Sequence, residues 1–192
     1  MIAIIKYNAG NITSVQNAVT RMGYDSIITD DAQKILAADK VIFPGVGEAN
    51  SAMDYLKKKG LDKVLLSVKA PMLGICLGLQ LMCNSTEEGD TKCLGIFDAQ
   101  VKRFPPKDKV PHIGWNSFVK CDGTLFKSID KDDDVYYVHG YYATIGLETI
   151  ATCDYIIPFS AAMQKNNFYA TQFHPEKSAS VGEQLLLNFL SI

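Results

Sequence analysis

A cysteine framed by glycines is the first feature of this sequence that could do chemistry. Cys76 lies between Gly74 and Gly78 in the stretch GICLGLQLM, after an apolar segment and before a helix-like pattern. A side chain at a strand-to-helix turn projects at the carboxyl edge of a sheet, where open parallel sheets bind ligands. The helix N-terminus favours a thiolate, and the glycines permit the sharp bend. Cys76 is therefore a candidate nucleophile, with a buried packing cysteine as the alternative.

A cysteine nucleophile needs a base, and the base needs a group that orients it. Of the three histidines, His174 ends a strand-like segment and lies in the stretch QFHPEKS. Pro175 fixes the backbone that follows. Glu176 is close enough along the chain to accept a hydrogen bond from the imidazole and to set its tautomer. The spacing predicts a catalytic triad of Cys76, His174 and Glu176; a strand-end histidine beside a surface carboxylate is the alternative.

A glycine-rich turn, Pro44-Gly45-Val46-Gly47, follows another strand-like segment. Such a turn can aim backbone N–H groups at an anion. Phosphate binding is the rival interpretation, but neither a GxxxxGK[ST] nor a GxGxxG pattern is present. An oxyanion hole built from the N–H of Val46 or Gly47 together with that of Leu77 suits a nearby thiol better.

These motifs stand in a first half that alternates strand and helix patterns. Asn11 can cap a first helix, and Gly23 and Gly60 can end helices. Strand patterns cover residues 1–7, 26–29, 40–43 and 71–75. Helix patterns follow residue 11 and cover residues from about 48 to 59, and another helix begins within 77–83. This alternation predicts an α/β fold with a mostly parallel central sheet flanked by helices.

The second half is rich in Val, Ile, Tyr and Phe and favours strands. We expect strands at 101–104, 117–120, 135–143, 150–153 and 167–173, and a last helix at about 181–190. They predict hairpins or an added antiparallel layer. Neither a repeat nor a linker divides the sequence, so we expect a single domain over residues 1–192.

Composition excludes several classes of protein. With 47% hydrophobic and 21% charged residues, the chain can bury a sizeable core, and its net charge of −2 disfavours a nucleic-acid binder. The apolar N-terminus is too short to span a bilayer, so we expect no membrane segment. The five cysteines form no CxxC pair, which argues against a structural metal site and indicates free thiols in a reducing cytoplasm.

Taken together, PGVG, GICLGLQLM and QFHPEKS resemble the class I glutamine amidotransferases, over essentially the whole chain. Three further stretches, YNAGNI at 7–12, PHIGWN at 111–116 and VHGY at 138–141, are most similar to the glutaminase subunits of imidazole glycerol phosphate synthase. The resemblance implies that L-glutamine is hydrolysed through a Cys76 thioester, with His174 moving the proton and Glu176 orienting His174. It implies no cofactor and no metal.

The resemblance also assigns binding roles. Leu77 and Val46 match the oxyanion donors, and in this family the second donor forms only when a partner is engaged. The positions that match glutamine-binding residues are Gln80, Glu88, Gly140 and Tyr141; the family usually has Ser or Thr where this chain has Gly140. The positions that match partner-facing residues are Asn11, Trp115, Tyr136 and Lys177, which without the family would be a helix cap, a core aromatic, a strand tyrosine and a solvated lysine.

The partner implied by the family is a separate cyclase subunit of the (β/α)₈-barrel type, which receives the ammonia in a heterodimer serving histidine biosynthesis. Two alternatives stay open. One is a glutaminase for another acceptor, such as pyridoxal phosphate, anthranilate or a sugar-modification substrate. The other is a non-catalytic regulatory protein, against which the intact Cys76, His174 and Glu176 argue.

Overall fold

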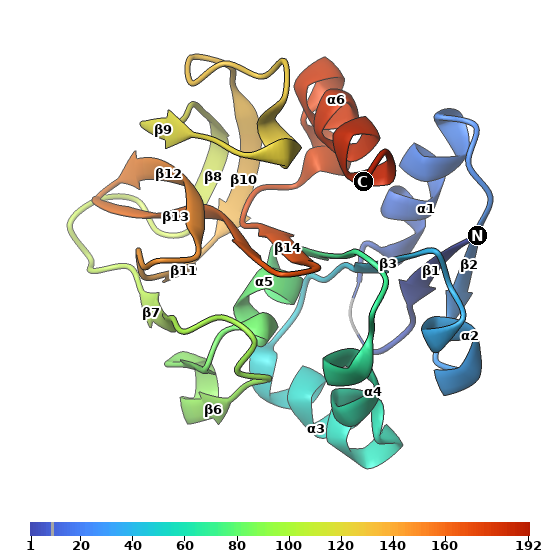
Figure 1. The fold of residues 1–192 in the computed structure, drawn as a ribbon. Helices are drawn as coiled ribbons and strands as arrows, with labels where there is room; N and C mark the ends of the chain where they lie inside the picture. The colour runs from blue at the N-terminus through green and yellow to red at the C-terminus, as the bar shows by residue number, and fades with distance from the viewer. Residues whose placement is uncertain (9) are drawn as a thin grey trace.

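A computed structural model describes residues 1–8 and 10–192; Ala9, in the stretch 7–12, lies outside the described residues. Its central feature is an eight-stranded sheet, seen nearly edge-on in Figure 1. In spatial order the strands are β2 (Ser26–Thr29), β1 (Ile2–Ile5), β3 (Lys40–Phe43), β4 (Met72–Ile75), β14 (Phe168–Thr171), β13 (Ile157–Lys165), β12 (Thr149–Tyr155) and β9 (Lys120–Cys121). Neighbours from β2 to β14 pair in parallel, and those from β14 to β9 pair antiparallel.

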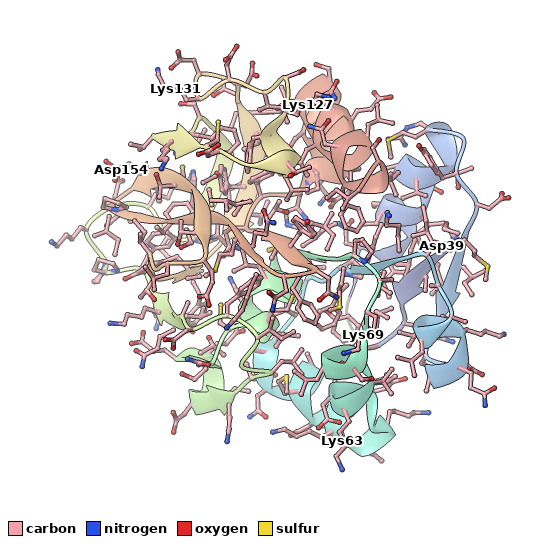
Figure 2. All side chains as sticks on the ribbon, viewed as in Figure 1. Asp39, Lys63, Lys69, Lys127, Lys131 and Asp154 are labelled. Atoms are coloured by element: carbon pink, nitrogen blue, oxygen red, sulfur yellow. The ribbon has the colours of Figure 1, made fainter. Side chains whose placement is uncertain are left out.

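Helices cover both faces of the parallel half of the sheet. Alternation along β1 sends Ile2 and Ile4 to one face and Ala3 and Ile5 to the other, and each face has its own apolar core. The first core is covered by α1 (Ile12–Arg21) and α6 (Ala179–Leu190), and the second by α2 (Ala32–Leu36), α3 (Ala49–Lys59), α4 (Leu61–Ser67) and α5 (Leu77–Met82). Charged side chains such as Lys63 and Lys131 extend outward from the rim (Figure 2).

Two smaller sheets lie beside the antiparallel half. One pairs β10 (Val135–His139) with β8 (His112–Asn116), and the other has the order β11 (Tyr141–Ala143), β7 (Gln100–Arg103), β5 (Ser85–Thr86) and β6 (Thr91–Lys92). Short 3-10 turns are η1 (Glu88–Asp90), η2 (Thr124–Phe126) and η3 (Pro175–Lys177). The expected α/β class and parallel sheet are therefore confirmed. Antiparallel strands extend the central sheet, and the small sheets are antiparallel except for the parallel pair β5–β7.

Two of the expected strands are wrong in extent. The strand predicted at 135–143 is broken at Gly140, and its halves pair with β8 and β7 in different sheets. The strand predicted at 117–120 is absent except at Lys120, because the N–H of Phe118 donates to Lys131 and that of Val119 donates to Thr152. Residues 117–119 therefore lack the continuous pairing of a strand, which begins only at Lys120.

Several elements have weak sequence signals and were not predicted, for physical reasons. β13 carries Pro158 and the small residues Ser160, Ala161 and Ala162, which have weak strand propensity. β8 contains Gly114 and alternates only weakly between buried and exposed residues. The last helix begins at Ala179, two residues earlier than expected, and α1 follows Asn11 without a side-chain cap. The Asn11 side chain donates to Glu176 instead.

A buried histidine pair fills the space between β8, β10 and β13. His112 stacks on Tyr155 with ring centroids 3.9 Å apart and on Tyr137 at 4.9 Å. Its Nδ1 lies 3.2 Å from Nε2 of His139, which packs against Phe159. Burial disfavours the charged imidazole, so the pKa falls to about 4 for His112 and about 3 for His139.

Gly78→Ala should destabilise the protein strongly. A Cβ at Gly78 would lie 2.0 Å from the carbonyl oxygen of Phe43, so β3 and α5 could not keep their contact. We expect a loss of about 3 kcal/mol or more in the free energy of unfolding, measured by urea denaturation. Gly146→Ala is the matched control, since its nearest neighbour would be Asp98 O at 3.7 Å. Equal stability of the two variants would contradict this packing.

The histidine pair should make the fold sensitive to acid. Below its ordinary pKa of about 6.5, an unfolded histidine binds a proton that the buried one does not, so the free energy of unfolding falls as the pH falls. Between pH 7 and pH 5, His139 alone should account for a loss of about 2 kcal/mol. Urea denaturation at both pH values should show that the free energy of unfolding of His139→Gln falls about 2 kcal/mol less between pH 7 and pH 5 than that of the unsubstituted chain. An unchanged pH dependence in the variant would refute a neutral buried His139.

Candidate active site

Cys76 forms a tight elbow between β4 and α5. Its backbone has φ 52° and ψ −104°, outside the regions that residues with side chains prefer. The Cys76 N–H donates to Thr171 O at 2.7 Å, and its carbonyl accepts from the N–H of Gln80 at 3.2 Å. A strained residue persists only where its surroundings hold it, and such residues gather at functional sites. The expected elbow, with its close helix packing at Gly78, is present.

His174 and Glu176 lie together at the end of the neighbouring strand. His174 Nδ1 is 2.8 Å from Glu176 Oε1, and both side chains are almost fully buried. Ser178 fixes the turn, because its hydroxyl donates to His174 O at 2.7 Å and accepts from the N–H of Tyr136 at 2.9 Å. A carboxylate on Nδ1 leaves Nε2 as the working nitrogen. Within the described part of the chain, His174 Nε2 has no hydrogen-bond partner.

The charge balance around His174 favours the imidazolium. Burial opposes the charge, but the neighbouring Cys76 thiolate and the Glu176 carboxylate outweigh it and raise the pKa of His174 to about 10. A protonated imidazole beside a sulfur stabilises the thiolate form of that sulfur. Cys76, His174 and Glu176 are therefore a candidate nucleophile, base and orienting carboxylate, with the charged form of the imidazole favoured.

A cleft of about 250 Å³ opens beside the elbow. Its walls hold Cys76 together with the predicted oxyanion and substrate-binding residues Val46, Gly47, Leu77, Gln80, Glu88, Gly140 and Tyr141, and also Pro111, Val138 and His139. Another cleft, of about 300 Å³, lies between α1 and α6 and borders Glu176, but Cys76 does not line it. The cleft at the elbow is the one that can present a bound carbonyl to the sulfur.

The glycine-rich turn after β3, residues 44–47, lies against the elbow, and its Val46 N–H is not placed to act with Leu77 as an oxyanion donor. Leu77 N–H donates to the carbonyl of Gly45 at 3.3 Å. Because a trans peptide directs its C=O and N–H to opposite sides, the N–H of Val46 points away from Leu77. The Val46 carbonyl accepts from Gly10 N–H at 3.0 Å, and Tyr7 Oη donates to Pro44 O at 2.6 Å. Both candidate donors, Val46 and Leu77, are thus turned away or occupied.

The candidate substrate residues are already engaged with the protein. Gln80 Nε2 donates to Tyr141 O at 3.0 Å and to Gln172 Oε1 at 3.1 Å. Glu88 Oε2 accepts from Ala49 N–H at 2.9 Å, which caps α3. At Gly140 a Cβ would meet its nearest neighbours at 3.9 Å, so a Cβ would fit there.

The four candidate partner-facing residues are not equally available. Trp115 is 53% exposed and packs edge to face on Tyr136, with centroids 5.7 Å apart. Lys177 is exposed on η3. The Asn11 amide instead donates to Glu176 Oε1. Asn11 therefore connects the segment before α1 to the carboxylate that holds His174.

Three contacts to the site were missed from the sequence. Gln172 Nε2 donates to Cys76 Sγ at 3.6 Å, and Cys76 Sγ lies 3.7 Å from Val138 O, to which a thiol donates. Ser178 fixes the turn at His174. Gln172 and Ser178 open and close the stretch QFHPEKS, so their place beside a candidate base was the available signal.

The chain is similar to known proteins over its full length. The family model for glutamine amidotransferase class-I matches residues 4–191. The imidazole glycerol phosphate synthase subunit HisH of Bacteroides fragilis (strain YCH46) is 54% identical, covering 100% of this chain and 99% of that protein. The protein of the same name from Pasteurella multocida (strain Pm70) is 44% identical, over 98% of this chain and 96% of that protein.

Solved structures show the same fold at low sequence identity. A structure described as PurLQS from Thermotoga maritima has a TM-score of 0.71 and 14% identity, covering 99% of this chain and 97% of that one. A structure described as a glutamine amidotransferase has a TM-score of 0.77 and 15% identity, covering 100% and 98%. The family match and the full-length relatives show that the chain belongs to the class I glutamine amidotransferases.

Proposed function

We propose that this chain is the glutaminase subunit of an imidazole glycerol phosphate synthase and hydrolyses L-glutamine to glutamate and ammonia. The observation that carries the proposal is the convergence at one sheet edge of a strained Cys76, a buried His174–Glu176 pair and a cleft of about 250 Å³. The names of the full-length relatives support the pathway. The five free cysteines agree with action in a reducing cytoplasm.

The chemistry follows from the charges of the triad. The Cys76 thiolate attacks the amide carbon of glutamine, and the carbonyl electron pair moves to oxygen. His174, which holds the thiol proton, gives it to the leaving nitrogen as the C–N bond breaks and ammonia departs. His174 then takes a proton from water, which attacks the thioester; the C–S bond breaks, glutamate leaves, and the thiolate and protonated His174 are restored. Glu176 keeps Nε2 of His174 facing these atoms throughout.

The cleft can orient an amino acid at both ends. Gln80 uses its Nε2 within the protein, so its Oε1 is the atom left to accept from a ligand. Glu88 has one carboxylate oxygen on Ala49 and a second for the substrate's α-ammonium. Gly140 and Tyr141 also line the cleft, and their backbone would hold the α-carboxylate.

The partner is a cyclase subunit of the (β/α)₈ type, bound as a heterodimer through the surface around Trp115, Tyr136 and Lys177. Lys177 supplies a positive charge, and the exposed Trp115 and Ile113 on β8 offer an apolar contact to the partner. Asn11 would connect this surface to the candidate triad, because its amide donates a hydrogen bond to Glu176. Ammonia released at Cys76 would pass to the cyclase active site through this interface.

Loss of the sulfur should abolish turnover. In Cys76→Ala we expect glutamate release to fall by about 10⁴-fold or more, and in Glu176→Gln by roughly 10²–10⁴-fold. The assay measures glutamate formed from glutamine in the presence of the cyclase partner with its nucleotide substrate. Cys83→Ala is the matched control, since Cys83 is equally buried at the end of α5 but does not line the cleft. An active Cys76→Ala variant would exclude the thioester route.

The partner should switch the glutaminase on. With Leu77 N–H bound to Gly45 O, the isolated chain lacks a formed oxyanion hole. A flip of the Gly45–Val46 peptide would free Leu77 N–H and turn Val46 N–H inward, which is worth about 10²–10³-fold in rate. Glutamate release should therefore rise by that factor when the cyclase and its nucleotide substrate are added. Comparable turnover with and without them would show that another acceptor pathway is served or that the flip is not limiting.

A further inference from the structure

A series of hydrogen bonds with fixed direction leads from a backbone carbonyl to the candidate nucleophile. Tyr141 O accepts from Gln80 Nε2 at 3.0 Å, Gln80 Nε2 also donates to Gln172 Oε1 at 3.1 Å, and Gln172 Nε2 lies 3.6 Å from Cys76 Sγ. Gln172 is fully buried. Gln172 and Cys76 are 96 positions apart in the sequence, so the fold and not the local chain brings them together.

The direction of this series is set by the chemistry of its first member. A carbonyl oxygen only accepts, so the Gln80 atom that faces Tyr141 O must be the NH₂ group. The same NH₂ group faces Gln172, which must therefore present its amide oxygen to Gln80. The other end of the Gln172 amide, its NH₂ group, is then the end that faces Cys76 Sγ. Rotating either amide would place two donors or two acceptors against each other.

The buried histidine pair locks the same carbonyl from the other side. His139 Nδ1 lies 2.8 Å from Tyr141 O, so it carries the proton and donates. His139 Nε2 is then the acceptor for Nδ1–H of His112, 3.2 Å away. Tyr141 O thus accepts two hydrogen bonds, one from Gln80 and one from His139, which fix its role as an acceptor.

Two contacts on Cys76 favour opposite protonation states. The carbonyl of Val138, 3.7 Å from Sγ, accepts a hydrogen bond from a thiol and repels a thiolate. The N–H of Gln172 does the reverse, because a buried donor stabilises an anionic sulfur. Gln172 is not among the residues that line the cleft, so this donor acts on the sulfur and not on the substrate.

We propose that Gln172 is a further catalytic residue, a buried donor that holds Cys76 Sγ as a thiolate poised for attack. The proton leaves for His174, and the Gln172 N–H remains on the sulfur until the C–S bond forms. The catalytic part rests on the proposed glutaminase function, whereas the effect on the thiolate is a property of the protein alone. A purely structural amide would contribute to packing but leave the protonation of Cys76 unchanged.

The test measures the pH dependence of Cys76 alkylation by iodoacetamide in the full chain, followed by mass spectrometry of the peptide that contains Cys76. Gln172→Met keeps the length of the side chain and removes the donor. Gln172→Glu keeps the acceptor for Gln80 and places a negative charge near the sulfur. Gln164→Glu adds the same charge on β13, away from the cleft, as the matched control. Cys121, on the edge strand β9, is the internal reference in every sample.

We expect the apparent pKa of Cys76 alkylation to rise by about one unit in Gln172→Met and by about two units or more in Gln172→Glu. Gln164→Glu should match the unsubstituted chain, and Cys121 should not change. In glutamate release with the cyclase partner, kcat should fall by about 10-fold in Gln172→Met, with KM for glutamine unchanged within about 3-fold. Thermal unfolding of each variant confirms that it is folded.

An unshifted alkylation pKa in a folded Gln172→Met variant would overturn the proposal, whatever happens to activity. If Gln172→Glu does not fold, Gln172→Met decides alone. If the unsubstituted chain and its partner release no glutamate but the alkylation pKa shifts as expected, the glutaminase assignment fails and the role of Gln172 toward the thiolate stands. If the chain and its partner release glutamate normally but the alkylation pKa of Cys76 does not shift in Gln172→Met, the glutaminase assignment stands and the proposed role of Gln172 fails.

Discussion

The strained backbone of Cys76 is the constraint on which the site depends. Three adjacent strands hold it. Thr171 on β14 accepts its N–H, β4 leads directly into it, and Gly45 after β3 accepts the next N–H along the chain. Because these strands are parallel, the glycine-rich turn, the candidate nucleophile Cys76 and the candidate base His174 all follow strand ends at one edge of the sheet. The same three strands that position the sulfur therefore also deliver the groups that act on it.

This arrangement explains which parts could be predicted from sequence. Cys76, His174 and the turn at 44–47 each follow a short apolar strand, and parallel order brings such ends together without any knowledge of side-chain packing. The contacts of Gln172 and Val138 with the sulfur could not be foreseen, because they depend on side-chain direction between residues 96 and 62 positions apart. The strand break at Gly140 was hidden for a similar reason, since apolar residues continue on both sides of it while the pairing partner changes.

The hydrogen bonds around the triad describe a resting state. Leu77 N–H is bound to Gly45 O, and the carbonyl of Val138 faces Sγ, so both contacts favour an unreactive thiol without an oxyanion hole. Against them stand the raised pKa of His174, caused by its charged neighbours despite burial, and the donor on Gln172. The balance between these groups is local, and a small rotation of one peptide changes it. A flip of that peptide would free Leu77 N–H, which is the change that the proposed activation requires.

The break at Gly140 connects these two sets of contacts. Val138, just before it, directs a carbonyl at the sulfur, while Tyr141, just after it, directs a carbonyl at Gln80 and His139. At this point the chain passes from the β10–β8 pair to the sheet that contains β11 and β7, and both Val138 and Tyr141 line the cleft. One interruption thus supplies both the acceptor for the thiol and the anchor that fixes the direction of the Gln172 amide.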